Sequence, residues 1–320
     1  MDTVRVGTRG CQPLGPFSLA RQNQYFGGWP TSGEDGAGIV MAFPVEGRWG
    51  SAAVALRQDA DGALTGTVAA EDLDAAWRQS LAIHSLDVDG RGYPGIGERD
   101  PVIGRLQAEH AHLRPVLFNS PYEAACAFVI AHRLSMVQGR AIRARIAERH
   151  GEAITVVGRT VHAFPAPQRL LTLDTLPGLT EEKVRRLHGI ARAALDGGLE
   201  RERLRQQPVD QAIADVRRLR GIGDFFAAGI VLRGAGMVDA VPDEEITRAG
   251  IRRLYGLPGP LTASGLDAVT RTWQPYRMWC SVLVHVAERR HRPHTGEAVK
   301  GEASRSGPGV ERGREHADDR

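Results

Sequence analysis

The stretch of residues 219–232 (LRGIGDFFAAGIVL) constrains the fold of this chain more than any other part of its sequence. Gly221 and Gly223 lie between two apolar segments of helical composition, so the stretch predicts two helices joined by a tight hairpin. Glycine permits positive φ and a close approach of backbone N–H groups, and the second helix adds the positive end of its dipole, so a phosphate can bind there. An ordinary αα-hairpin is the alternative, because a lone Gly-x-Gly is common.

The remaining sequence divides into three parts. Residues 1–99 contain strand-like segments separated by Gly, Asp and Pro, and then a helical pattern. The segments are 38–43, 51–56 and 63–68, and the helical pattern is 71–84. Residues 100–290 have a helical pattern that Pro and Gly interrupt at ordinary helix lengths, and residues 291–320 are too poor in apolar side chains to form a core. We therefore predict an α+β protein with an N-terminal antiparallel β-rich domain, a mainly helical domain and a disordered tail.

Composition narrows the classes of function. The net charge of +3 indicates an anionic partner only weakly. The sequence has neither a signal peptide nor a run of about 18 apolar residues, so we expect a cytoplasmic protein with no membrane role. Three widely spaced cysteines and histidines without ligand spacing predict neither a zinc site nor an iron–sulfur cluster. Lys183 and Lys300 are the only lysines, which leaves few candidates for a Schiff-base nucleophile.

An acidic cluster follows the predicted hairpin. Asp243, Glu244 and Glu245 come directly after Pro242, and Asp243 follows Gly221 by 22 residues. Carboxylates after a proline are typical of a helix N-terminus, where they complement the helix dipole, and this structural role is compatible with a chemical one. The hairpin followed by this acidic loop resembles the helix-hairpin-helix and Gly-Pro-Asp (HhH-GPD) signature of base-excision DNA glycosylases.

The resemblance extends over roughly residues 15–290. In order and spacing it is greatest for the alkylation-repair branch, the bacterial 3-methyladenine DNA glycosylases II, which carry an added N-terminal sheet domain. Six further stretches support it: 113–116 (LRPV), 120–125 (SPYEAA), 163–170 (AFPAPQRL), 176–179 (LPGL), 232–234 (LRG) and 273–277 (WQPYR).

The resemblance implies a catalytic carboxylate in the acidic cluster. We assign it to Asp243, which keeps the spacing from the hairpin that the endonuclease III branch has. The loop is one or two residues shorter than in the alkylation-repair branch, so Glu244 and Glu245 are the alternates. Breaking an N-glycosidic bond builds oxocarbenium character on the sugar, which a partly desolvated carboxylate beside C1′ can stabilise.

The resemblance also implies residues that bind DNA. Arg220, Arg233 and the backbone of the hairpin, which includes Ile222, are expected to hold phosphates. Where the family usually has a glutamine followed by a residue that wedges into the minor groove, this chain has His132 and Arg133. We expect Arg133 to fill the gap left by a flipped nucleotide. A solvated helix face is the alternative for this segment.

Four aromatic residues are candidates for a base pocket, because aromatic faces attract the positive charge of alkylated purines. They are Phe225, Phe226, Trp273 and Tyr276. Each of them could instead belong to the core. Gly229 stands where the alkylation-repair branch suggests an aromatic residue, which predicts a roomier pocket.

The resemblance further implies monofunctional hydrolysis. The bifunctional branch places a lysine where this chain has Phe225, so water is the expected nucleophile and an abasic site the expected product. No cofactor is expected, except that the resemblance implies a possible monovalent cation bound by carbonyls of the hairpin, as in relatives.

We therefore expect a base-excision-repair glycosylase that releases an alkylated purine of the 3-methyladenine type from duplex DNA. A glycosylase for another lesion, such as 8-oxoguanine or uracil, and a catalytically inactive damage-binding protein are the alternatives. The expected partner is double-stranded DNA with a damaged base, at the nucleoid of a bacterial cytoplasm. No obligate protein partner is evident, and a monomer is expected.

Overall fold

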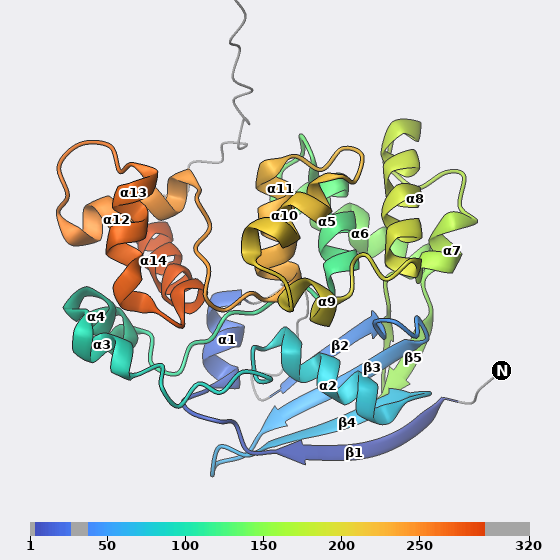
Figure 1. Ribbon diagram of the computed structural model, residues 1–320. Coiled ribbons are helices and arrows are strands. Elements are labelled where there is room, and N and C mark those ends of the chain that lie inside the picture. Colours follow the sequence, from blue (N-terminus) through green and yellow to red (C-terminus); the bar gives the residue numbers. More distant parts are fainter. Residues whose placement is uncertain (1–3, 27–37, 292–320) are drawn as a thin grey trace, which may run out of the picture.

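The computed structural model of the chain describes residues 4–26 and 38–291, which form an antiparallel sheet and a larger array of helices (Figure 1). The sheet contains β1 (Arg5–Cys11), β2 (Gly38–Pro44), β3 (Ser51–Gln58) and β4 (Leu64–Ala70) in the order β1-β4-β3-β2, with each neighbouring pair antiparallel. Strand β1 is a largely polar edge strand.

Both faces of the sheet are covered. Val54 and Leu56 of β3 pack in one cluster with Trp77 of α2 (Leu73–Ile83). On the opposite face, Ala53 and Ala55 pack against the hairpin of β5 (Ala153–Val156) and β6 (Arg159–His162). This coverage explains why residues 52–56 form a continuous apolar run and do not alternate with polar residues.

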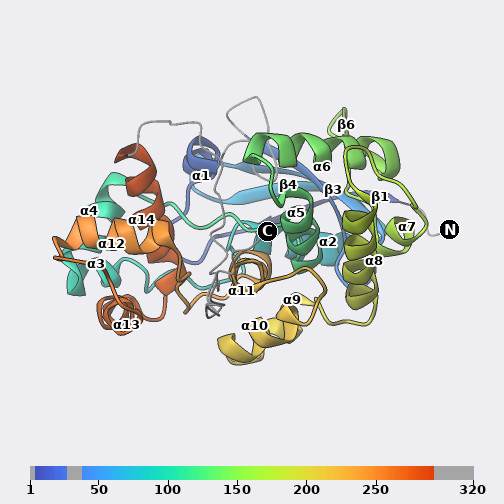
Figure 2. The same ribbon diagram turned by 90° about the horizontal axis from the view of Figure 1, so that it is seen from above.

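The helices lie in two groups (Figures 1 and 2). The first group is α5 (Pro121–Ala131), α6 (Met136–His150), α7 (Pro167–Leu171), α8 (Glu181–Leu195), α9 (Arg201–Arg205), α10 (Val209–Arg217), α11 (Asp224–Gly229) and the π-helical turn η1 (Ile230–Ala235). The second is α3 (Gly95–Arg99), α4 (Pro101–Glu109), α12 (Glu245–Tyr255), α13 (Ala263–Thr270), the 3₁₀ turn η2 (Arg271–Trp273) and α14 (Arg277–His291). Helix α1 (Leu19–Phe26) lies near the sheet.

The central helix of the first group is α5. Ser120 caps its N-terminus by accepting a hydrogen bond from the N–H of Glu123, and Pro121 occupies the first turn, where its missing N–H costs nothing. Most of its residues are buried, because α6, α8, α11 and η1 all pack against it. Helix α5 therefore provides the fixed surface on which the predicted hairpin rests.

A buried arginine ties the N-terminal segment to the helices. The guanidinium of Arg114 donates hydrogen bonds to the carbonyls of Leu14, Pro16, Ser85 and Val88, so all of these contacts go to backbone oxygens. Burial lowers the pKa of Arg114 to about 10, which leaves it charged at neutral pH.

The α+β class and the N-terminal antiparallel sheet are confirmed. Two parts of the sheet region were not predicted: edge strand β1, and the β5–β6 hairpin, which lies within the sequence expected to be helical. This hairpin packs on the sheet, so the two regions share a core across the predicted boundary at residues 99 and 100. The predicted tail, apart from His291, lies outside the described residues. None of the helices in residues 4–26 and 38–291 is long and apolar enough to cross a membrane.

Candidate active site

The predicted hairpin forms between α10 and α11. Gly221 has φ +85°, a conformation that favours glycine, and a Cβ there would lie 2.6 Å from Cδ of Arg186, so that side chain would have to move. Ile222 is buried and anchors the turn in the core. Gly223 is the N-cap residue of α11, and no side chain in the described part of the chain caps this helix start. The N–H groups at the start of α11 are therefore available to a ligand, whereas the N–H of Ile222 already donates to the carbonyl of Leu219.

An exposed arginine lies directly beside the hairpin. The side chain of Arg220 is 77% exposed, and its Nη2 lies 3.4 Å from Oε1 of Glu182. The same carboxylate also pairs with Arg185 and Arg186 on α8. Arg220 is thus placed at the surface where the predicted phosphate contact requires it, and the contact itself stays a prediction.

The helix that leaves the hairpin packs tightly on α5. A Cβ at Gly229 would lie 2.5 Å from Cζ of Phe128, and a Cβ at Gly234 would lie 2.9 Å from Cβ of Ala124. The ring of Phe128 therefore occupies the space at Gly229, and the expectation of a roomier pocket there is wrong. Close packing holds η1 against α5, directly before the loop that carries the acidic cluster.

The three acidic residues of that loop have different surroundings. Both carboxylate oxygens of Asp243 pair with Arg248, at 2.6 Å from Nε and 2.8 Å from Nη2, and the side chain is 48% exposed. Glu245 is exposed in the first turn of α12. Glu244, the N-cap residue of α12, is 24% exposed, and its Oε1 lies 3.5 Å from Nε2 of His285.

Glu244 lies where the two helix groups meet. Burial raises the pKa of its carboxyl group, and the positive charges of Arg233 on η1 and Arg289 on α14 oppose that rise. Among the three candidates, Glu244 is thus the partly desolvated carboxylate, and within the described residues no arginine binds both of its oxygens as Arg248 does for Asp243. The sequence favoured Asp243 and left Glu244 and Glu245 as alternates, because the spacing of the loop does not reveal that Arg248 binds Asp243.

Arg233 faces this acidic residue and not the hairpin turn. Its Nη2 donates a hydrogen bond to the carbonyl of Val116 at 3.1 Å, and burial lowers its pKa to about 10. It remains a cation at neutral pH and influences Glu244 electrostatically. This placement does not support the phosphate contact predicted for Arg233, because its guanidinium is largely buried.

The four aromatic candidates for a base pocket lie in two separate clusters. Phe226 stacks on Phe128 with ring centroids 5.1 Å apart, and Phe225 is 58% exposed beside it. Trp273 is fully buried, and its Nε1 donates a hydrogen bond to Asp100. Tyr276 is also buried, with its hydroxyl bound to the carbonyl of Asp89. The expectation of one pocket from all four is corrected, because Trp273 and Tyr276 belong to the core of the second helix group.

The turn between α5 and α6 presents Arg133. This residue is exposed and has φ +61°, a strained conformation for a residue other than glycine. The turn is held on both sides: Ser135 and Gln138 form a capping box at the start of α6, and Nζ of Lys183 donates hydrogen bonds to the carbonyls of Ile130 and His132, at 2.8 and 2.9 Å. The strained, exposed position fits the predicted wedge, which stays a prediction.

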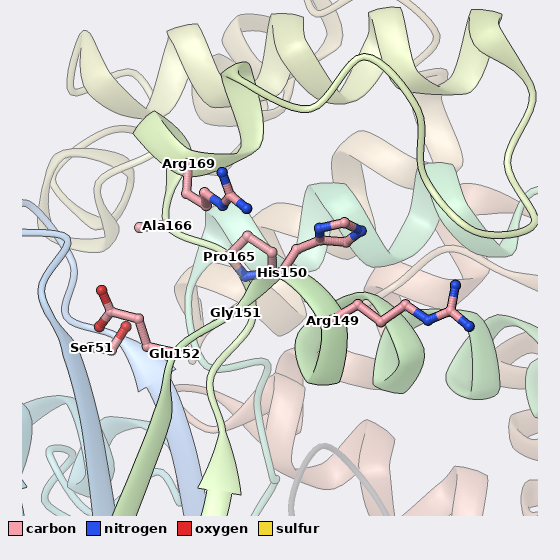
Figure 3. A pocket seen from close by; sticks show the side chains of 8 residues that line it. All are labelled: Ser51, Arg149, His150, Gly151, Glu152, Pro165, Ala166 and Arg169. Carbon is pink, nitrogen blue, oxygen red and sulfur yellow. The ribbon is translucent and has the colours of Figure 1, made fainter.

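A cavity of about 280 Å³ lies elsewhere, between the sheet and the first helix group (Figure 3). Its lining includes Ser51, Arg149, His150, Glu152 and Arg169, with Glu152 and Ser51 opposite Arg169 in the view. None of the predicted site residues lines it. Within the described residues, no group of three or more His, Cys, Asp and Glu side chains could hold a metal ion.

Comparison with known proteins gives this geometry a context. No protein-family model matches the chain. A curated relative, DNA-3-methyladenine glycosylase of Bacillus subtilis (strain 168), is 24% identical over 165 residues, which are 50% of this chain and 54% of that protein. The chain thus spans about half the length of the curated relative it matches.

Solved structures match over most of the chain. A 3-methyladenine DNA glycosylase from Archaeoglobus fulgidus superposes with a TM-score of 0.70 at 19% identity, over 88% of this chain and 98% of that one. An 8-oxoguanine glycosylase/lyase from Clostridium acetobutylicum, in complex with double-stranded DNA containing cytosine opposite 8-oxoguanine, gives 0.64 at 14% identity, over 91% and 99%.

The chain therefore has the fold of the HhH-GPD DNA glycosylases, and the resemblance found in its sequence is confirmed. Its sequence is similar to that of a DNA-3-methyladenine glycosylase, the type that the sequence motifs indicated.

Proposed function

We propose that this chain is a monofunctional DNA glycosylase that hydrolyses the N-glycosidic bond of a flipped, alkylated purine of the 3-methyladenine type in duplex DNA. The observation that carries the proposal is the combination of a glycine hairpin, whose outgoing helix packs on α5 through α11 and η1, with a partly buried carboxylate, Glu244, at the end of the loop that follows η1. The fold and the match to the Bacillus subtilis relative support the same class of reaction. This activity would act at the nucleoid in a bacterial cytoplasm.

We assign the catalytic role to Glu244 in preference to Asp243. The carboxylate of Asp243 is already neutralised by Arg248 and is half exposed to water, so it has little charge left for a substrate. Glu244 is more desolvated, and a desolvated anion attracts a developing oxocarbenium ion more strongly. Its role would be to stabilise that cation or to orient the attacking water.

The remaining residues would bind and distort the DNA. The N–H groups of the hairpin and Arg220 would hold phosphates, and Arg133 would fill the gap left by the flipped nucleotide. Phe225 and Phe226 would stack on a base. Lys183 would not act as a lyase nucleophile, because its Nζ already donates to two backbone carbonyls.

Base release from a panel of DNA substrates tests the proposal. The panel contains methylated duplex DNA and duplexes with a single 8-oxoguanine or uracil, and released bases are separated by chromatography. We expect release of methylated purines, with strand breakage only after alkali and no covalent complex on borohydride treatment. Release of 8-oxoguanine or uracil alone would replace the proposed lesion, and binding without release of any base would identify a damage-binding protein.

A further inference from the structure

We propose that His285 is a positioning residue that fixes the carboxylate of Glu244 by donating a hydrogen bond from Nε2. The proposal rests on the proposed function, because it takes Glu244 as the catalytic carboxylate. His285 lies in an apolar stretch of α14, 41 residues after Glu244, and no sequence signal connects the two residues.

Close packing of α12 on α14 brings the two side chains together. Gly250 of α12 permits the approach, since a Cβ there would lie 2.5 Å from Cγ1 of Val284. One turn earlier on α12, Oγ1 of Thr247 lies 2.8 Å from Nε2 of His285. This contact with Thr247 is a hydrogen bond, and Oε1 of Glu244 lies 3.5 Å from the same nitrogen, so Nε2 has a short contact to the hydroxyl and a longer one to the carboxylate.

The imidazole is neutral at physiological pH. Burial lowers the pKa of His285 to about 3, and the positive charges of Arg233 and Arg289 act in the same direction. The charged groups that face Glu244 are these two arginines, from η1 and α14, while Asp243 and Glu245 flank it on its own segment. A neutral donor gives Glu244 a hydrogen bond without a further positive charge that would oppose the sugar cation.

A glutamate in this role needs such a partner more than an aspartate does. The side chain of glutamate has one more rotatable bond than that of aspartate, so its carboxylate is less restricted by its own backbone. A catalytic group must be held within about 0.5 Å of its working position. With its hydrogen on Nε2, His285 restricts the carboxylate and favours its ionised form.

Variants of His285 separate this role from simple packing. His285→Phe keeps a planar ring without a donor, and His285→Gln retains an N–H donor. We expect His285→Phe to slow single-turnover release by roughly 10- to 100-fold, the size of one hydrogen bond to a charged group, with DNA affinity unchanged. The acidic limb of its rate–pH profile should move to higher pH, and His285→Gln should restore both the rate and the profile.

A direct titration of Glu244 does not depend on activity. In protein labelled with ¹³C at the glutamate carboxyl groups, the Glu244 signal is assigned from its loss in Glu244→Gln. We expect the pKa of Glu244 to rise in His285→Phe and to fall in Thr247→Val, because removing the hydroxyl leaves the Nε2 hydrogen to the carboxylate alone. Opposite shifts in two variants of one contact would not arise from loosened packing.

The outcomes distinguish this inference from the proposed function. An unchanged pKa of Glu244 in folded His285→Phe and Thr247→Val would overturn the positioning role, whatever the activity. The predicted pKa shifts in a protein that releases no base would establish the contact and overturn the catalytic assignment. If His285→Phe does not fold, the titration of Thr247→Val alone decides.

Discussion

Replacing Gly221 by alanine tests whether the hairpin depends on that glycine. The residue has φ +85°, and a side chain in the left-handed region costs about 1–2 kcal/mol. The new Cβ would lie 2.6 Å from Cδ of Arg186, which must move away from its 3.1 Å contact with Glu182. That partly exposed ion pair is worth about 0–1 kcal/mol, so we expect Gly221→Ala to lower the free energy of unfolding by about 1–3 kcal/mol.

Two matched glycine variants separate the contributions of backbone conformation and of the helix N-cap to the free energy of unfolding. Gly158→Ala has φ +75° and no atom within 4 Å of its Cβ, so it measures the conformational cost alone. Gly223→Ala has φ −90° and an equally open Cβ, so it measures only the exchange of an N-cap glycine, up to about 1 kcal/mol.

Urea unfolding gives the stabilities, and fluorescence anisotropy with an undamaged duplex gives the affinities. We expect Gly221→Ala to be the least stable of the three and to bind DNA about tenfold more weakly, whereas Gly158→Ala should bind normally. The tenfold loss corresponds to about 1.4 kcal/mol, of the order of one hydrogen bond to a charged phosphate. Equal stability of Gly221→Ala and Gly158→Ala with normal DNA binding would refute this reasoning.

Three further predictions concern other parts of the structure. Lys183→Met removes two hydrogen bonds that hold the turn before Arg133, so we expect a smaller fraction of flipped base, measured by the fluorescence of 2-aminopurine in the duplex. An unchanged fluorescence signal would show that the turn does not need the lysine. Trp273→Phe removes a buried N–H that binds Asp100 and should cost about 1–3 kcal/mol in urea unfolding, whereas a loss of base release without a loss of stability would place the indole in the pocket. His84 is buried with its pKa lowered from 6.5 to about 4, so stability present above pH 6.5 is lost as the pH falls, by about 3 kcal/mol at pH 4. His84→Asn, which keeps a donor near Nδ1, should remove that loss; an unchanged slope of stability against pH would contradict it.

Much of the fold could be predicted from local sequence patterns, because residues close together in the chain determine where these strands and turns begin and end. The strands at residues 38–43, 51–56 and 63–68 are bounded by turn residues, and the hairpin glycines lie between apolar helices, so both could be recognised without tertiary contacts. Strand β1 and the β5–β6 hairpin could not be recognised, because polar or short segments become strands only when the rest of the sheet is there to pair with or pack on them.

The site was predicted less completely, because it depends on side-chain contacts that the sequence pattern does not show, both local and long-range. The acidic cluster was visible, but the choice between Asp243 and Glu244 depends on Arg248 and on the packing of α12 against α14. The aromatic residue Trp273 was assigned to the pocket, yet its partner Asp100 lies 173 positions earlier in the sequence and makes it a core residue. Spacing along the chain carries no information on such pairs.

Single-turnover release of methylated purines from methylated duplex DNA, compared among the wild type, Glu244→Gln and Asp243→Asn, tests the central claim most directly. Each substitution removes one carboxylate charge and nearly preserves shape, so the two variants are mutual controls. We predict that Glu244→Gln loses about 10²- to 10³-fold or more in rate while binding DNA normally, and that Asp243→Asn retains most of the wild-type rate. Loss of release in Asp243→Asn with activity retained in Glu244→Gln would contradict the account.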